Sequence, residues 1–289
     1  MNEFESWVSG AKIPLGQWGK EAVEWTTRNF EWFFDAISVG LQVPIEGSVA
    51  ILDAVPAAIL IASIAGIAYF LQRSWWLVLF VVAGLLLILN QGLWEAMIET
   101  LVLIIYATLV SLIIGVPIGI LAARRPWIYR FLSPILDMMQ TIPTFVYLVP
   151  VLILFGLGLV PGIVATVVFA VPAPIRLTYL GISQVPSALV EAGQSFGCTG
   201  WQLLLRVKIP AALPTIMAGV NQCIMLSMSM VVIAALVGAG GLGKPVVRAL
   251  NSVNVPLGIE SGLAIVVVAI ILDRLLKQRV TKRSGGSKK

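Results

Sequence analysis

Charged residues are scarce in this sequence, and histidine is absent. Only 11% of the 289 residues are Asp, Glu, Lys or Arg, whereas soluble domains usually carry about 25%. Hydrophobic residues make up 59% of the chain. These proportions exclude an ordinary soluble domain and predict a protein whose solvent is largely lipid.

Cysteine is also rare, and the two residues present, Cys198 and Cys223, do not have a metal-binding spacing. We expect two free thiols and no metal site. The net charge of +5 does not indicate nucleic-acid binding either, because residues 1–50 hold three Lys or Arg against seven Asp or Glu. The positive charge therefore gathers in the later connectors and the C-terminal tail. This distribution is typical of membrane orientation and argues against a nucleic-acid partner.

The phosphate-binding motif G-x4-G-K-[ST] does not occur in the sequence. We therefore expect no enzymatic activity and no ATP hydrolysis by this chain. The segment Gly238–Gly243 matches G-x-G-x-x-G, but it follows a predicted membrane helix instead of a β-strand. We interpret it as a flexible or close-packed loop on the outer side, not as a dinucleotide site.

Seven apolar segments have about the length that a helix needs to cross the roughly 30 Å hydrocarbon core of a bilayer. They are residues 50–71, 75–91, 96–122, 131–157, 160–180, 211–236 and 258–276. Helices are expected because lipid offers no water to pair with backbone groups. Only three residues separate the first two segments, which predicts a tight hairpin. The sequence therefore predicts an all-α polytopic membrane protein with about seven transmembrane helices.

Lys and Arg residues gather in the connectors on one side of these spans and in the C-terminal tail. The positive-inside rule then predicts a multi-pass plasma-membrane protein with its N-terminus outside and its C-terminus in the cytoplasm. We divide the chain into an external N-terminal segment (1–47), a transmembrane domain (48–278) and a basic cytoplasmic tail (279–289).

The external segment is predicted to be an amphipathic helix. From Leu15 to Leu41, aromatic residues lie on one flank and charged residues on the other. This pattern favours a helix at the level of the lipid headgroups over a loosely folded tail. Pro44 and Gly47 are expected to end the helix before the first span.

The polar segment 186–210 is the longest predicted cytoplasmic connection. Ser187 is a plausible N-cap, Gly197 a natural stop, and Thr199–Gln202 a capping-box pattern that opens a second short helix. Pro210 is expected to end that helix. The predicted helix, glycine turn and helix form a knob that docks on a cytoplasmic partner.

The spacing in this segment resembles the EAA loop of ATP-binding-cassette (ABC) importer permeases, E-A-A-x3-G-x9-I-x-L-P. Three positions differ, with Gly193 in place of the second Ala, Val207 in place of Ile and Ile209 in place of Leu. The resemblance implies that a separate ATPase subunit is coupled to this chain here. The residues that match the motif are Glu191, Ala192, Gly193, Gly197, Val207, Ile209 and Pro210.

The resemblance extends over nearly the whole chain. Segments 13–18, 136–150, 214–222 and 270–275 are similar to the glycine betaine/proline permease subunits of that superfamily. This similarity implies a type I ABC importer permease fold in a bacterial inner membrane, paired with a second copy of itself. It also implies two cytoplasmic subunits that hold ATP and Mg, an external substrate-binding protein, and no cofactor on this chain.

The expected activity is the import of glycine betaine or a related quaternary amine by alternating access. The sequence leaves open glycine betaine, proline betaine, choline, carnitine and trimethylamine N-oxide. An ion-gradient-driven secondary transporter is the alternative, but it calls for a coupling acid at the membrane midplane, and none is evident. A non-transporting scaffold would leave the 186–210 segment without a role.

Quaternary ammonium groups donate no hydrogen bonds and are held by aromatic faces. Residues of suitable type recur at helical spacing on the fourth and sixth predicted spans, and the competing interpretation is simple helix packing. These pathway candidates are Met138, Thr141 and Phe145 on the fourth span and Asn221, Met225 and Met228 on the sixth, and Tyr147 is a further candidate near the fourth-span set. Among acids near the span ends, Asp137 is the candidate for a cytoplasmic vestibule, whereas Glu95 and Glu99 suit solvation or pairing.

Overall fold

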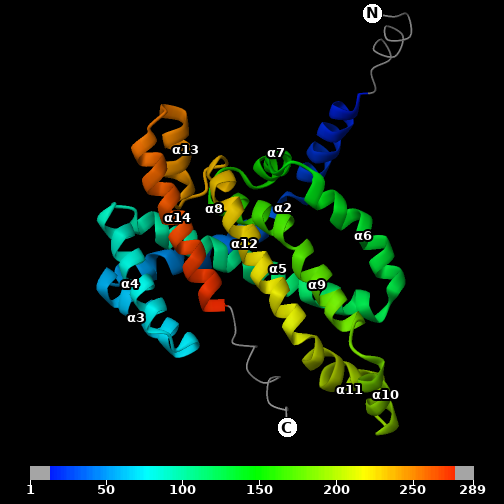
Figure 1. Ribbon diagram of the computed structural model, residues 1–289. Coiled ribbons are helices and arrows are strands. Elements are labelled where there is room, and N and C mark those ends of the chain that lie inside the picture. The colour runs from blue at the N-terminus through cyan, green and yellow to red at the C-terminus, as the bar shows by residue number, and fades with distance from the viewer. Residues whose placement is uncertain (1–13, 277–289) are drawn as a thin grey trace, which may run out of the picture.

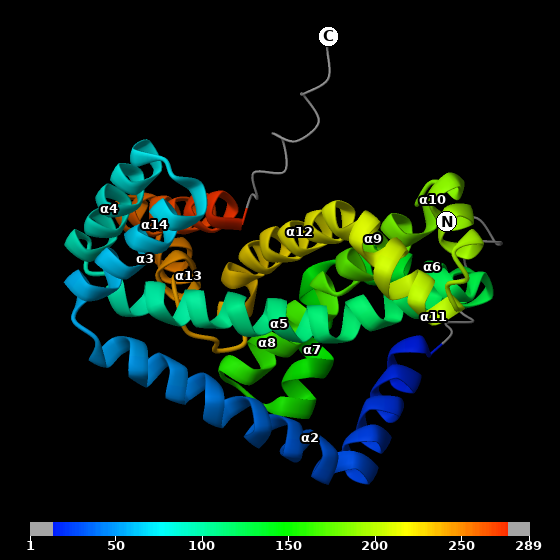
Figure 2. The ribbon, with the colours of Figure 1, turned by 90° about the horizontal axis from the view of Figure 1, so that it is seen from below.

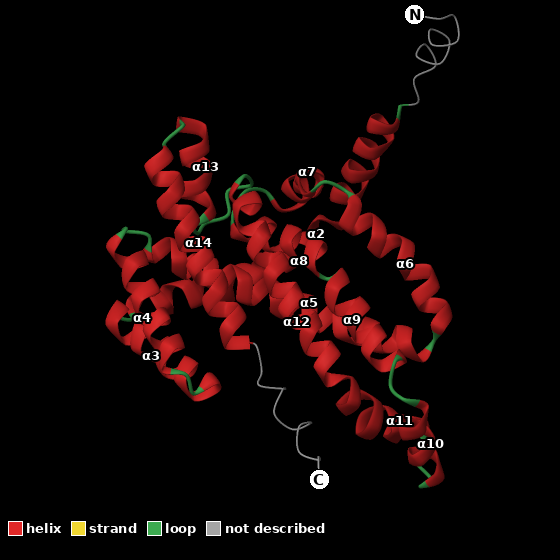
Figure 3. Cartoon of the chain, in the orientation of Figure 1, coloured by secondary structure: helices red, strands yellow, loops and turns green. Residues whose placement is uncertain are grey.

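Helices form all the regular secondary structure of residues 14–276, the part of the chain that the computed structural model describes (Figure 3). Their order is α2 (Leu15–Ala54), α3 (Ala57–Gln72), α4 (Trp75–Asn90), α5 (Trp94–Arg124), α6 (Pro126–Thr141), α7 (Thr144–Phe155), α8 (Leu159–Ala170), α9 (Pro172–Ser183), α10 (Ser187–Ser195), α11 (Gly200–Leu203), the π-helical turn η1 (Leu204–Lys208), α12 (Ile209–Ala235), α13 (Gly243–Ser252) and α14 (Val255–Leu276). Residues 1–13 and 277–289, which include the predicted basic tail, lie outside the described residues.

The centre of the molecule is built from α5, α9 and α12, which pack against one another (Figure 1). Glycines bring α5 and α9 close together. A Cβ atom added to Gly119 would lie 2.6 Å from the Cβ of Thr178, and one added to Gly115 would lie 2.7 Å from the Cγ of Pro174. Small residues permit such close approach between membrane helices, where the hydrophobic effect does not drive association.

Within residues 14–276, five helices are long and apolar enough to cross a bilayer, and the bent pair α6–α7 is a sixth candidate. The five are Gly16–Ala54, Trp94–Arg124, Leu159–Ser183, Gly200–Ala235 and Val255–Leu275. The predicted hairpin is present as α3 and α4, which each have 16 residues and so fall short of the about 20 that a straight crossing needs. The prediction of an all-α membrane architecture is confirmed, while two of the seven predicted segments form short helices.

The predicted segment 131–157 is wrong only as a straight helix, because the chain bends by 98° between α6 and α7. Ile142 is extended, with ψ at 130°. It precedes Pro143, and a proline ring disfavours helical backbone at the residue before it. Helix α7 then restarts at Thr144, directly after the proline.

The predicted break at Pro44 and Gly47 is also wrong, because α2 continues through both residues to Ala54. Ile45 is fully buried against the cluster formed with α5 and α8. The Tyr106 hydroxyl of α5 donates a hydrogen bond to the Pro44 carbonyl at 3.0 Å. This packing holds the helix together, and α2 kinks instead at Phe30 (φ −125°, ψ 21°) (Figure 2). Its placement on the outer membrane surface stays a prediction.

Candidate functional site

The segment 186–210 begins with the predicted short helix, but its first cap differs from expectation. Ser187 is the first helical residue of α10 instead of its N-cap, because the preceding Pro186 occupies the cap position. The Pro186 carbonyl accepts the hydrogen bond from the Leu189 amide at 3.0 Å. The helix therefore starts one residue earlier than the serine cap would allow.

Gly197 ends this helix as predicted. Its φ of 76° is in the left-handed region, which glycine adopts without a Cβ penalty. Its N–H donates to the Gln194 carbonyl at 2.9 Å, and the Cys198 N–H donates to the Gly193 carbonyl at 3.1 Å. These two bonds form a Schellman motif, which turns the chain sharply toward α11.

The predicted capping box is confirmed at the start of α11. The Thr199 N–H donates to Gln202 Oε1 at 2.9 Å, and the Gln202 N–H donates to Thr199 Oγ1 at 3.4 Å. The expected end of this helix at Pro210 is wrong. The π turn η1 joins α11 to α12 in one continuous helix, and Pro210 lies inside it as the second residue of α12.

The residues that match the coupling motif fall into three groups by their exposure. Glu191, Ala192, Gly197 and Pro210 are exposed, whereas Val207 and Ile209 are partly buried. Gly193 is buried, and a Cβ atom there would lie 2.6 Å from Leu203 Cδ1 and 3.4 Å from Val207 Cγ2. Gly193 therefore leaves room for the end of the Leu203 side chain where α10 packs on the α11–η1 segment.

Sequence reasoning missed the exposed apolar side chains of this knob. Phe196, directly before the turn glycine, is 89% exposed, and Leu189 and Trp201 are exposed as well. Large apolar residues on a polar, solvent-facing segment would have been the signal, since such patches mark interaction sites. The Trp201 ring also contacts the end of α5, with the Arg124 guanidinium 5.0 Å from the ring centroid.

The structure does not gather the predicted pathway residues of the fourth span on one helix face. The bend at Pro143 leaves Met138 and Thr141 on α6 and carries Phe145 and Tyr147 onto α7. Met138, Thr141 and Phe145 are exposed. The Tyr147 hydroxyl reaches back across the bend and donates to the Met139 carbonyl.

On α12, the three pathway candidates have three different surroundings. Met225 is exposed, whereas Met228 is buried in the hydrophobic cluster that includes Ile224 and Val231. Asn221 is partly buried, and its Oδ1 atom is buried without a hydrogen-bond partner. Met228 thus packs helix against helix, while Asn221 and Met225 remain candidates.

Asp137 is paired instead of standing alone. Its Oδ1 atom lies 2.6 Å from Nη2 of Arg176, which joins α6 to α9. The stacked rings of Tyr129 and Tyr179, with centroids 3.6 Å apart, join the same two helices. The carboxylate that the sequence marked for a vestibule therefore helps to hold α6 in place.

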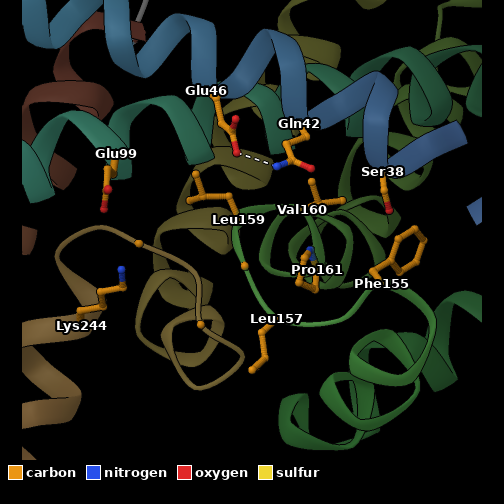
Figure 4. Close-up of a pocket in the computed structure, with 13 residues that line it drawn as sticks. Ser38, Gln42, Glu46, Glu99, Phe155, Leu157, Leu159, Val160, Pro161 and Lys244 are labelled. Carbon is orange, nitrogen blue, oxygen red and sulfur yellow. Dashed lines mark hydrogen bonds between the residues drawn. The ribbon is translucent and has the colours of Figure 1, made fainter. Parts of the chain in front are cut away.

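A cavity of about 300 Å³ lies at the end of the molecule that also carries α13, called here the α13 end (Figures 1 and 4). It is lined by Ser38, Gln42, Glu46, Glu99, Phe155, Leu157, Gly158, Leu159, Val160, Pro161, Gly238, Gly240 and Lys244. One side is α2, where Gln42 Nε2 donates to Glu46 Oε1 at 2.7 Å. Figure 4 shows Glu99 and Lys244 at one end of the cavity and Phe155 at the other.

The G-x-G-x-x-G segment forms one wall of this cavity as a close-packed loop. The Glu99 carboxylate accepts a hydrogen bond from the Gly241 N–H, and Thr100 Oγ1 accepts one from the Leu242 N–H at 2.8 Å. A Cβ atom on Gly240 would lie 2.1 Å from Glu99 Oε2. Gly240 and Gly241 therefore allow the loop to pack on α5, whereas Gly238 lies against Leu157 and Gly243 against α12. Of the two roles left open for Glu99, solvation or pairing, the structure shows a hydrogen bond to this loop.

Residues 115–280 match the protein-family model described as the binding-protein-dependent transport system inner membrane component. The chain is 45% identical to the glycine betaine transport system permease protein OpuAB of Bacillus subtilis, over 96% of this chain and 98% of the relative. It is also 45% identical to the glycine betaine/carnitine transport permease protein GbuB of Listeria monocytogenes, over 91% of this chain and 94% of that relative. It is similar to a chain of the MetNI methionine ABC transporter in an inward-facing conformation, with a TM-score of 0.55, 26% identity, and coverage of 65% of this chain and 94% of that chain.

Proposed function

Because the chain belongs to the family of binding-protein-dependent transport system inner membrane components, we propose that it imports methylated zwitterionic solutes as the permease subunit of an ABC transporter. The observation that carries this function is the 186–210 segment. It projects from one end of the molecule, exposes Phe196 and Trp201, and runs without interruption into α12 (Figure 1). A separate ATPase subunit hydrolyses the ATP, and this chain is the membrane path.

The substrate class follows from the names of the relatives. They are permeases for glycine betaine, for glycine betaine and carnitine, and, at 43% identity over 67% of this chain, for trimethylamine N-oxide. These solutes share a methylated cationic nitrogen and an anionic oxygen. The family match supports ATP-driven import and does not support the alternative of an ion-gradient-driven transporter.

The proposed assembly is a pair of these chains with two ATPase subunits and an external binding protein. ATP and Mg are held by the ATPase subunits, and this chain binds no cofactor. ATP binding draws the two 186–210 segments together and opens the pathway outward, and hydrolysis resets it. The opposite end of the molecule, which carries α10 and α11 and is called here the α11 end, then lies in the cytoplasm (Figure 1). The α13 end with its cavity faces outward, and the N-terminus lies outside.

Uptake of radiolabelled glycine betaine tests this function. The permease is reconstituted in proteoliposomes with its ATPase and external binding protein, and uptake is measured with ATP, with a non-hydrolysable ATP analogue, and with a sodium or proton gradient alone. Uptake that requires ATP hydrolysis supports the proposal. Uptake driven by an ion gradient without ATP would contradict it, as would equal uptake in vesicles that lack this chain.

A further inference from the structure

One helical rod connects the exposed 186–210 knob to the cavity at the opposite end of the molecule. Residues Gly200–Ala235, comprising α11, η1 and α12, form 36 consecutive helical residues. The loop 236–242 follows immediately and supplies the wall of the cavity at Gly238 and Gly240. The knob and this wall are therefore the two ends of a single continuous element.

Helix α5 contacts this element at both of its ends. At the α11 end, Arg124 stacks over Trp201. At the α13 end, the Glu99 carboxylate accepts the Gly241 N–H and the Thr100 hydroxyl accepts the Leu242 N–H. Glu99 and Arg124 lie 25 residues apart on one helix, so about 37 Å of α5 spans the two attachments. The views from two directions agree that α5 runs beside α12 (Figures 1 and 2).

The attachment at the α13 end is buried and leaves no space for added side-chain atoms. Thr100 and Leu242 are both fully buried, at 0% exposure. A Cβ atom on Gly241 would lie 2.5 Å from Thr100 Oγ1, and one on Gly243 would lie 2.3 Å from the Val231 carbonyl. The loop is thus fixed between α5 and the end of α12 and cannot shift relative to one without breaking its contacts with the other.

We propose that Glu99 is a positioning residue that clasps the 236–243 loop to α5, so that α5 and the α11–α12 rod move as one body. A displacement that the ATPase imposes on the 186–210 knob then reaches the cavity wall at the α13 end. This inference rests on the proposed function. It assigns to Glu99 the transmission of movement through the Gly241 amide, and not contact with the transported solute.

The test compares Glu99→Ala with Glu99→Gln in the full reconstituted transporter. The glutamine keeps an oxygen that accepts the Gly241 N–H, whereas alanine removes the acceptor. We expect Glu99→Ala to lower glycine betaine uptake per ATP hydrolysed by about tenfold, the size of effect expected for loss of one charge-assisted hydrogen bond. Glu99→Gln should restore at least half of the ratio. Glu95→Ala, an exposed carboxylate one turn earlier on α5, is the matched control and should leave the ratio unchanged.

Two outcomes overturn the clasp. One is a normal uptake-to-hydrolysis ratio in Glu99→Ala, including the case in which uptake and hydrolysis fall together with the amount of assembled complex. The other is equal impairment in Glu99→Gln, which would assign the effect to the charge. Thr100→Val, which is nearly isosteric, removes the second acceptor and should lower the same ratio even if Glu99→Ala assembles poorly.

Hydrogen exchange in the permease alone separates this inference from the proposed function. In nanodiscs, we expect the Gly241 and Leu242 amides to exchange at least about tenfold faster in Glu99→Ala than in the unmodified chain or in Glu99→Gln. Equal exchange in all three contradicts the clasp whether or not the complex transports betaine. If Glu99→Ala shows the expected faster exchange but the unmodified complex does not take up glycine betaine, the result counts against the proposed function only.

Discussion

Glycines of this protein meet three separate geometric needs. Gly197 supplies a left-handed backbone at a turn, Gly193 lets two short helices touch, and Gly240 lies where a Cβ atom would overlap a carboxylate oxygen. Only the first need can be recognised from local sequence, since a helix-ending glycine has a known position relative to its caps. The other two depend on side chains that are distant in the chain.

Substitution of the turn glycine tests the first of these needs. We expect Gly197→Ala to lower the free energy of unfolding by about 1 kcal/mol, because alanine disfavours the left-handed region. Gly200→Ala is the control, since Gly200 has open space around its Cβ position and lies at the start of a helix. Thermal unfolding in detergent measures both variants. Equal midpoints for the two would show that the turn carries no strain.

At the scale of single elements, three interior prolines have three different effects. Pro143 separates α6 from α7 with a 98° bend, Pro44 lies within a continuous α2, and Pro210 lies just after a π turn as the second residue of α12. The covalent constraint of the ring is the same in each case. Neighbouring contacts decide the result. At Pro44, the buried Ile45 and the Tyr106 hydroxyl hold the helix against α5.

Removal of that hydroxyl tests the attachment of α2. We expect Tyr106→Phe to lower the free energy of unfolding by about 1 kcal/mol, because the Pro44 carbonyl loses its donor from α5. It should also speed amide exchange in residues 41–54. Tyr69→Phe, an exposed tyrosine on α3, serves as the control. If the two variants unfold at the same temperature, the hydroxyl does not stabilise the contact between α2 and α5.

At the scale of the whole molecule, the exposed 186–210 knob and the cavity lie at opposite ends. The α11 end carries the exposed knob with Phe196, and the α13 end carries the cavity between α2 and the glycine loop. The core helices α5, α9 and α12 connect these ends through close glycine contacts. Under the proposed function, this arrangement separates the ATPase contact from the outer end of the pathway, and the core helices connect the two.

A charge at the tip of the knob tests partner binding at this scale. We expect Phe196→Asp to weaken binding of the ATPase subunit by at least about tenfold, because an exposed aromatic residue at an interface centre often contributes more than 1 kcal/mol. Leu250→Asp, an exposed apolar residue on α13, is the matched control. Co-purification and titration of the ATPase measure the affinity. Equal affinity of both variants would mean that the knob is not the ATPase contact.

The sequence by itself determined the solvent, the helical class and the family. Apolar runs of span length can form only helices in lipid, and the spacing from Glu191 to Pro210 is a local pattern that is legible without a structure. The capping box at Thr199 and the stop at Gly197 were predictable for the same reason, since their hydrogen bonds join residues at most five positions apart.

Tertiary structure alone decided how these parts meet. The clasp between Glu99 and Gly241 joins residues 142 positions apart, and the bond from Tyr106 to Pro44 joins residues 62 apart. No periodicity links such pairs, so their partners become evident only when the helices are packed. The glycine motif that resembles a dinucleotide fingerprint is therefore a contact surface for α5, because its amides are already taken by Glu99 and Thr100.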